Sequence, residues 1–443
     1  MAQNVGARHS VSSEKRTATM IVEQTVGDLA GVCHRTAAEA PRPARNQAGS
    51  ADAWINAIQL YRFPLALAVV AVHSGQFVIN PAAAAASGAG RGGLGLWMVE
   101  FLTMVSRMAT PSFLVIAGIV FCRNGQVSFE QYGRKLRSRF YTLLLPYLAW
   151  NLIAVLLLCA PWACKHFFLE PGTGTYSPCD FRSLAKWLVG WPVFPANAPL
   201  WFVRDLLILL AVAPLMNLVP KRVQVLGISA LALYWLLGPL DLIPGGIPRA
   251  GSVLFFLVGA WIGMNRISLK ENPAVNRIIV VAAGVLLCSA AAGAGFATAD
   301  TNPIAAKALL EKIVRVSGSL LVVCAATKPV VFSSLSRLLL RLSPASFFLF
   351  ASHHCSLFCL SVLFKYCPQG RLGIAREFVL FGAIFSATVT VSLGCYFLLK
   401  RYAPSLLSLL DGNRSDRGSQ ARDESRPDAL PLPISTQPVY SFH

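Results

Sequence analysis

Charged residues are scarce in this chain of 443 residues, because Asp, Glu, Lys and Arg together make up only 13% of it. Water-soluble proteins carry about 25% of such residues. Hydrophobic residues reach 55% and the mean hydropathy is +0.56. The composition therefore excludes a string of water-soluble domains and indicates an integral membrane protein.

Acidic residues are the rarer charged type, with 20 Asp and Glu against 39 Lys and Arg and a net charge of +19. Such an excess would suit a nucleic-acid-binding protein if it formed one basic face. Here the basic residues separate long apolar runs, so no basic face can be assembled. We therefore expect no nucleic-acid partner and interpret the excess as loop charge that orients a multi-pass protein in the lipid bilayer.

Cysteine is too dilute for a disulfide scaffold, since 11 are spread over 443 residues and no two Cys-x-x-Cys pairs stand together. Cys164 and Cys179 share one long loop, where either a disulfide or two free thiols is possible. His353, Cys355 and Cys359 are residue types that bind metals, and they lie close together in the sequence. Their spacing does not converge on one point of a helix, so we expect no metal.

The two ends of the chain lack large apolar residues and long apolar runs. Residues 1–50 contain no segment that resembles a secretory signal. Residues 1–50 and 411–443 are rich in Ala, Ser, Pro, Arg and Gln, which predicts two disordered tails around a membrane domain at 51–410. No internal repeat of the kind found in inverted-repeat transporters is evident.

Long apolar stretches are what the sequence does contain. Lipid-exposed backbone must satisfy its own hydrogen bonds, and no alternating barrel pattern is present, so these stretches predict helices. We expect an all-α polytopic membrane protein with about ten transmembrane helices, at roughly 57–79, 97–121, 140–160, 199–219, 224–240, 251–264, 277–297, 313–331, 345–365 and 374–402.

The distribution of basic residues between the loops predicts the orientation. The loops on the same side as the termini, with the flanks of the domain, hold 17 Lys and Arg, against ten in the generally longer loops of the other side. Basic loops stay in the cytoplasm. Both termini should therefore be cytoplasmic, and the loop 161–198 should lie outside.

The first apolar segment carries two ionisable residues, Arg62 and His73. Eleven residues at 100° each come to about 20° past three full turns, so both side chains lie on one helix face, about 16 Å apart along the axis. An ionisable side chain in a bilayer costs at least about 2.5–3.5 kcal/mol, which makes each a functional candidate. The alternative is that Arg62 reaches the headgroups and His73 bonds to a neighbouring helix.

Other ionisable side chains lie near the ends of later segments. Glu100 and Arg107 precede the sequence around Pro111 and Gly118, where a bend or a close neighbour is expected. Arg107 either lines the site or simply lies near the far interface. Arg315 begins a pass, where contact with headgroups is the better interpretation.

Two adjacent pairs point in different directions. Arg204 and Asp205 are about 100° apart on a helix, so we expect that they cannot face one partner and that one of them pairs with another helix. The same angle separates His353 from His354. At most one of these two imidazoles should face the site that His73 lines.

The densest basic cluster precedes the third segment and consists of Arg134, Lys135, Arg137 and Arg139. Two interpretations stay open. The cluster can fix the topology, or its guanidinium groups can bind a polyanion such as the phosphates of a nucleotide cofactor.

With these residues the chain resembles the bacterial membrane-bound acyltransferase family 3, over roughly residues 53–402. The most specific feature is an Arg followed eleven positions later by His in the first helix. The other matching motifs are Arg107, Pro111, Phe113, Ala117 and Gly118; Arg139, Leu143, Leu144, Pro146 and Tyr147; Leu200, Trp201 and Phe202; and Ser343, Ser346, Phe347, Phe350 and His353.

The resemblance implies an enzyme of the bacterial cytoplasmic (inner) membrane that moves an acyl group, commonly acetyl, from acyl-CoA to a hydroxyl of a surface or secreted glycan. Acyl-CoA would be a co-substrate, with no permanently bound cofactor, and a glycan or lipid-linked sugar would be the acceptor. His73 would be the general base and Arg62 would hold the donor. Further binding residues would be Arg107, Arg134, Lys135, Arg137, Arg139, Trp201, Arg204 and His353.

Two other classes remain open from the residues alone. A transporter or flippase for an acidic or glycolipid substrate would use buried Arg and His without chemistry. An assembly or sensing protein would tolerate replacement of both Arg62 and His73. Hydrolysis or exchange of acyl-CoA that depends on His73 would separate an enzyme from both. The sequence carries no prediction of the oligomeric state.

Overall fold

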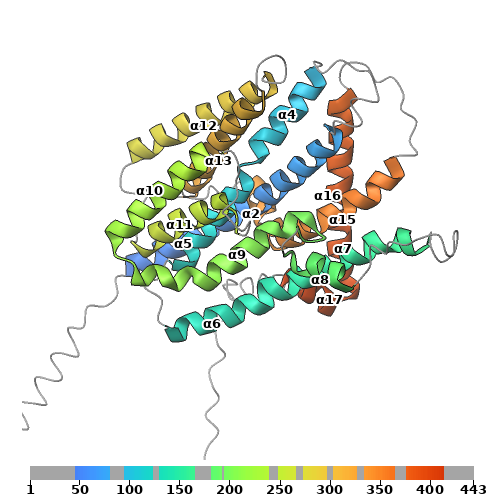
Figure 1. The fold of residues 1–443 in the computed structure, drawn as a ribbon, viewed down its shortest axis with the longest axis horizontal. Coiled ribbons are helices and arrows are strands. Elements are labelled where there is room, and N and C mark those ends of the chain that lie inside the picture. The colour runs from blue at the N-terminus through green and yellow to red at the C-terminus, as the bar shows by residue number, and fades with distance from the viewer. Residues whose placement is uncertain are drawn as a thin grey trace, which may run out of the picture. The chain divides into compact units, whose positions relative to one another are not determined.

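The computed structural model describes residues 45–79, 94–122, 129–164, 181–191, 194–238, 248–265, 273–296, 303–326, 334–364 and 376–413. Within these ranges every regular element is a helix (Figure 1). Internal contacts divide the chain into two units, Met1–Ile55 and Asn56–His443, and the second holds the helical bundle. The first helix begins at Arg45, inside the tail that was predicted to extend to residue 50, because this Ala-containing stretch continues the helix of the first pass.

Each of the ten predicted passes coincides with helical structure. The helices are α2 (Arg45–Val78), α4 (Leu94–Ser106) with α5 (Ala109–Cys122), η1 (Phe140–Leu144) with α7 (Leu145–Cys164), η3 (Ala198–Leu200), α9 (Trp201–Val212) and η4 (Ala213–Leu218), α10 (Lys221–Leu237), α11 (Ala250–Met264), α12 (Pro273–Phe296), α13 (Pro303–Ala325), α15 (Ser346–Phe364) and α16 (Arg376–Tyr402).

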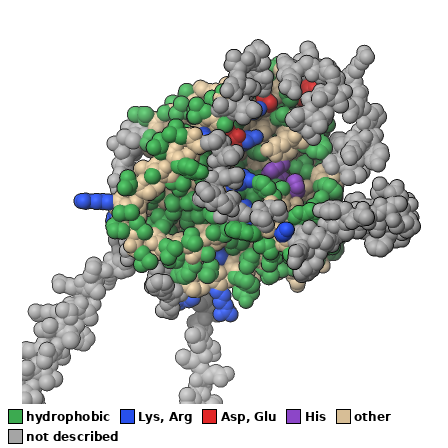
Figure 2. All heavy atoms as spheres, viewed as in Figure 1, with side chains coloured by type: hydrophobic (Ala, Val, Ile, Leu, Met, Phe, Trp, Pro, Cys, Tyr) green, Lys and Arg blue, Asp and Glu red, His purple; other side chains and the backbone are tan. Residues whose placement is uncertain are grey.

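Five stretches in the described part are each long and apolar enough to cross a membrane, namely Leu94–Cys122, Tyr132–Cys159, Ala198–Leu218, Asn276–Gly293 and Glu377–Tyr402. Figure 2 shows hydrophobic side chains over much of the visible face, as a lipid-facing surface requires. The predicted class, an all-α polytopic membrane protein, is therefore confirmed.

Four short helices were not predicted: α6 (Phe129–Arg139), α8 (Phe181–Val189), α14 (Ser334–Leu342) and α17 (Pro404–Asp411). Each has 8 to 11 residues and contains no long apolar run, so a search for such runs misses it. α6 continues through η1 into α7 without a break. α6 and α14 carry basic residues among apolar ones, a pattern typical of helices at a membrane surface.

The second pass is broken at Arg107 and Met108, between α4 and α5. Pro111 lies in the first turn of α5, where its missing N–H is tolerated. The Ser112 hydroxyl donates to the Met108 carbonyl at 2.7 Å, which satisfies one of the carbonyls at the break. The bend expected in this pass is thus present.

Helices α5 and α11 pack through glycines. A Cβ atom on Gly118 would lie 2.6 Å from the backbone nitrogen of Ala260, and one on Gly259 would lie 2.8 Å from the carbonyl carbon of Val115. Only glycine permits backbones to approach this closely. The predicted close neighbour at Gly118 is confirmed, and the contact fixes α11 against α5.

Two smaller clusters join the remaining helices. Met104, Leu287, Ala290, Ala291 and Val314 hold α4 against α12 and α13, which run side by side in Figure 1. A second cluster of Ala71, Val99 and Phe381 joins α2, α4 and α16. The first helix is therefore packed among helices from both halves of the sequence, which places its polar face inside the protein.

Candidate active site

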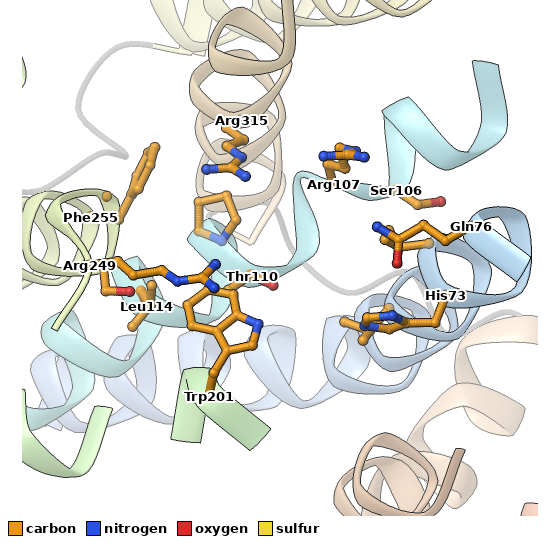
Figure 3. A pocket seen from close by; sticks show the side chains of 15 residues that line it. His73, Gln76, Ser106, Arg107, Thr110, Leu114, Trp201, Arg249, Phe255 and Arg315 are labelled. Carbon is orange, nitrogen blue, oxygen red and sulfur yellow. The ribbon is translucent and has the colours of Figure 1, made fainter. Parts of the chain in front are cut away.

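A pocket of about 170 Å³ opens beside the C-terminal half of α2. Residues of α2, α4, α5, α9, α11 and α13 contribute to it, together with Arg107 at the break after α4 and Arg249 just before α11 (Figure 3). The polar and aromatic residues among those that line it are His73, Gln76, Ser106, Arg107, Thr110, Trp201, Arg249, Ser252, Phe255 and Arg315.

His73 projects from α2 into this pocket and is only partly buried. Its ring centroid lies 5.2 Å from that of His353 and 6.2 Å from that of His354. Gln76, one turn further along α2, forms a side-chain hydrogen bond with it. Both imidazoles of α15 thus lie near the ring of His73, because α15 passes close to α2. Neither of them lines the pocket, which agrees with the expectation that at most one would face this site.

His353 is fully buried behind this contact. Its Nδ1 lies 2.5 Å from the carbonyl oxygen of Phe350, and a carbonyl oxygen can only accept, so Nδ1 carries the proton. Nε2 is then an acceptor, and it has no hydrogen-bond partner among the described residues. His353 does not line the pocket. Its ring lies next to that of His73, outside the pocket wall, and its Nε2 is a buried acceptor.

Two arginines that line the pocket form ion pairs with the same carboxylate. Arg107 Nη1 lies 2.6 Å from Glu311 Oε2, and the guanidinium of Arg315 pairs with Oε1 of the same residue. In Figure 3 both guanidinium groups lie on the same side of the pocket. The prediction that Arg315 reaches headgroups is therefore wrong. An ion pair with Glu311, one turn earlier on α13, directs it inward.

Arg249 and Trp201 form the opposite wall. The guanidinium carbon of Arg249 lies 3.9 Å above the centroid of the Trp201 ring and 5.0 Å from that of Phe194. Stacking on an aromatic face fixes a guanidinium and leaves its N–H groups directed sideways. Sequence reasoning missed Arg249, which was counted only as a loop charge, because its aromatic partner is 48 positions earlier in the chain.

Asp205 is completely buried and forms hydrogen bonds with residues of this wall. Its Oδ2 accepts from the Ser252 hydroxyl at 2.8 Å and from the Arg249 backbone N–H at 3.1 Å. Its Oδ1 accepts from Arg204 Nη2 at 3.0 Å, and Arg204 Nη1 donates to the Gly190 carbonyl at 2.5 Å. The expectation that one of this pair contacts another helix is confirmed, because Asp205 bonds to Ser252 of α11. The ion pair between Arg204 and Asp205 themselves was not predicted, and it forms because the long arginine side chain folds back onto its neighbour.

Arg204 therefore does not line the pocket, although it was predicted to bind substrate or cofactor. Its contacts are structural, because it ties α9 to the backbone after α8 and neutralises Asp205. Trp201, by contrast, lines the pocket as expected.

The segment before Trp201 is held by amides. The Asn197 backbone N–H donates to Asn151 Oδ1 at 3.0 Å, and Asn197 Nδ2 donates to the Ala351 carbonyl at 2.8 Å. Both asparagines are buried. They connect α7, the start of α9 and α15, and so fix Trp201 relative to the helix that carries His353.

The basic cluster of α6 and Arg62 lie away from the pocket. Arg62 is within electrostatic range of Arg139, while Arg134 and Arg137 are exposed. Lys135 donates to the Phe121 carbonyl at 2.8 Å and so stabilises the last turn of α5, a role that the sequence did not predict. None of these five residues lines the pocket, so the structure does not bring them together with His73.

Two other expectations concern cysteine and metal. The described residues hold no group of three or more His, Cys, Asp or Glu side chains that could bind a metal ion. Cys179 lies outside the described residues, as does the side chain of Cys164, so the suggested disulfide stays a prediction.

A family model described as "Acyltransferase domain" matches residues 55–397, which is most of the chain. The chain belongs to this acyltransferase family. The family match begins within α2, before Arg62 and His73, and ends within α16, so it covers every residue of the pocket. The resemblance found in the motifs is thereby confirmed, the protein is an acyltransferase, and the transporter and sensing alternatives are set aside.

One curated relative is the succinoglycan biosynthesis protein ExoH of Rhizobium meliloti (strain 1021). The two are 27% identical over 326 residues, which is 72% of this chain and 83% of the relative. No solved structure matches the chain. The site in this family member therefore has to be interpreted from its own geometry.

Proposed function

We propose that this acyltransferase moves an acyl group, acetyl as the first candidate, from cytoplasmic acyl-CoA to a hydroxyl of a surface or secreted glycan. The observation that supports this most is the position of His73, a partly buried imidazole that faces a pocket of polar and aromatic side chains in a membrane acyltransferase. A glycan acceptor is suggested by the name of the succinoglycan relative. The bacterial cytoplasmic membrane is the site at which such a reaction meets both substrates.

His73 acts as the general base in this proposal. Its unprotonated nitrogen takes the proton of the acceptor hydroxyl while the hydroxyl oxygen attacks the carbonyl carbon of the thioester. The C–S bond then breaks, and the imidazolium returns the proton to the CoA sulfur. The products are an ester on the glycan and free CoA.

The donor approaches from the end of α2 that carries Arg62. Arg62 lies about 16 Å from His73 along the helix, too far for contact and suited to the extended pantetheine arm of CoA. Arg139 is close to Arg62, and the exposed Arg134 and Arg137 follow on the same short helix. Guanidinium groups bind phosphate through paired hydrogen bonds, so α6 is the proposed site of the nucleotide phosphates.

The acceptor occupies the pocket at the other end. Trp201 and the Arg249 guanidinium stacked on it form a wall against which a sugar ring would pack. Arg107 lines the same pocket and would stabilise the tetrahedral oxyanion. His353 acts from behind His73 rather than on the substrate. The two substrates thus reach His73 from opposite ends of the bundle, which suits a cytoplasmic donor and an external acceptor.

Reconstitution tests this proposal. The full-length protein in lipid nanodiscs should transfer labelled acetyl from acetyl-CoA to the deacylated surface polysaccharide of its own cells, and mass spectrometry should find the ester on a sugar hydroxyl. Cells without the gene should lack that ester. An unchanged pattern of glycan esters in those cells would contradict the proposal.

Orientation is tested separately. Both termini are proposed to lie in the cytoplasm, because the loops on their side hold more basic residues. Alkaline phosphatase fused after Gly172 should be active, and the same enzyme fused after Gly412 should be inactive. The reverse pattern would invert the roles proposed for the two ends of the bundle.

A further inference from the structure

Positively charged side chains predominate among the described residues that line the pocket beside His73. Three arginines line it, Arg107, Arg249 and Arg315. Among the described side chains, the carboxylate that pairs with two of them is that of Glu311. The nearby carboxylate of Asp205 is engaged by the guanidinium of Arg204. Among the described side chains around this small space, cations therefore outnumber anions.

Contacts within the protein orient these arginines before any ligand binds. Arg249 lies flat on Trp201 at 3.9 Å, and its backbone N–H is held by Asp205. Arg315 and Arg107 are oriented by their shared partner Glu311. Figure 3 shows the guanidinium groups of Arg249 and Arg315 reaching toward the same space from two helices. Two guanidinium groups held in this way form a site for a planar anion.

One donor in the pocket wall has no partner. Arg107 Nε is buried and makes no hydrogen bond with any described residue. A buried N–H without an acceptor is unfavourable, and an oxygen of a bound ligand would satisfy it. This observation is independent of the count of charges and points to an oxygen-rich ligand at the same place.

From these observations we propose that the pocket binds a carboxylate carried by the acceptor sugar, so that the glycan is acidic and is recognised through Arg249 and Arg315. The guanidinium of Arg249, held flat on Trp201, would bind the acid group and place the sugar ring in the pocket with a hydroxyl directed at His73. This proposal rests on the proposed function and narrows its acceptor. The other possible carrier of a carboxylate here is the far end of a dicarboxylic acyl group.

The test compares matched acceptors and donors. Surface polysaccharide from the protein's own cells is deacylated, and half of it is carboxyl-reduced, which turns each uronic acid into the neutral sugar with the same linkage. The full-length protein in nanodiscs receives either polysaccharide with either acetyl-CoA or succinyl-CoA. We expect kcat/KM to be at least about tenfold higher for the acidic polysaccharide with acetyl-CoA as donor.

Variants connect that preference to the pocket. Arg249→Gln and Arg315→Gln should each reduce the ratio of kcat/KM for acidic over neutral acceptor toward one, mainly through KM for the acidic form. Arg249→Lys keeps the positive charge and loses the paired N–H groups of the guanidinium, so it should give an intermediate ratio. Lys186→Gln removes an exposed positive charge outside the pocket on α8 and should leave the ratio unchanged. A ratio within one preparation does not depend on how much protein folds.

The outcomes separate this inference from the proposed function. Equal rates with acidic and reduced polysaccharide, at normal activity, would overturn the acidic acceptor and leave the acyltransferase intact. A preference for succinyl-CoA that Arg249→Gln abolishes, without any preference between the polysaccharides, would move the carboxylate to the acyl group and likewise overturn it. Absence of transfer to both polysaccharides with both donors would contradict the proposed function itself.

Discussion

The imidazole rings of His73 and His353 lie with their centroids 5.2 Å apart and their planes tilted by 34°. They come from the first pass and the ninth, and 280 positions separate them in the chain. Because His353 Nδ1 is bound to the Phe350 carbonyl, Nε2 is the ring nitrogen that has no partner among the described residues. We infer that His353 positions the catalytic imidazole.

His353→Phe should separate this role from packing. Phenylalanine fills the space of the imidazole and removes a buried polar atom that has no partner, so the unfolding temperature should stay the same or rise. The turnover number should fall by about 10²-fold with little change in KM, since a displaced catalytic group costs about that much. Ser352→Ala is a matched control, because Ser352 is also buried without a partner on the same helix and should be silent. Unchanged turnover in His353→Phe would remove the positioning role.

Gly259→Ala tests whether the contact between α5 and α11 holds the pocket together. The new methyl group would meet the backbone at Val115, and overpacking of this kind costs about 1–3 kcal/mol. Activity should fall as well, because Ser252 and Phe255 of α11 line the pocket. Thermal unfolding in detergent and a transfer assay measure the two effects.

Gly284→Ala provides the control for that substitution. Nothing lies within 4 Å of a Cβ atom at Gly284 on α12, so alanine should be neutral or stabilise the helix by about 0.5–1 kcal/mol. Equal effects of the two substitutions would show that the close approach at Gly259 is not what matters.

Asp205→Asn should be strongly destabilising. It leaves the guanidinium of Arg204 buried without its counter-charge, and breaking a buried pair costs about 3–5 kcal/mol. The double variant Arg204→Leu with Asp205→Leu removes both charges and should recover part of that stability. A double variant no more stable than Asp205→Asn would show that the carboxylate matters mainly through Ser252 and Arg249.

Arg137→Gln combined with Arg139→Gln tests the donor end. If α6 binds the nucleotide phosphates, KM for acyl-CoA should rise and the effect of added salt on KM should weaken, while turnover at saturation changes little. Arg337→Gln on α14 removes an exposed basic residue from the side that is also predicted to be cytoplasmic and serves as the control. A change in protein yield alone would mean that the cluster only sets topology.

Much of this fold follows from composition, because about 20 apolar residues in a row have few alternatives to a membrane-spanning helix. The face shared by Arg62 and His73 likewise follows from helix geometry. The four short helices do not, since a helix of 8 to 11 residues contains no long apolar run.

The pocket was less accessible to sequence reasoning. His73, Arg107 and Trp201 were identified through motifs, and all three line it. Arg249 and Arg315 were assigned to loops or headgroups, because their direction depends on Trp201 and Glu311, and no rule of spacing relates residues on different helices. Arg204 was misassigned for the opposite reason, since its neighbour Asp205 neutralises it locally.

The central claim is that His73 transfers a proton during acylation. His73→Gln retains a side chain of similar size that can hydrogen-bond but does not take up a proton at neutral pH. General-base catalysis contributes roughly 10²–10⁴-fold, so His73→Gln and His73→Ala should lose glycan acylation to the same extent, at wild-type protein level and unfolding temperature. The decisive measurement is the rate of acyl transfer by His73→Gln in nanodiscs. A rate lower by about 10²-fold or more supports the account, and a rate near that of the wild type would contradict it.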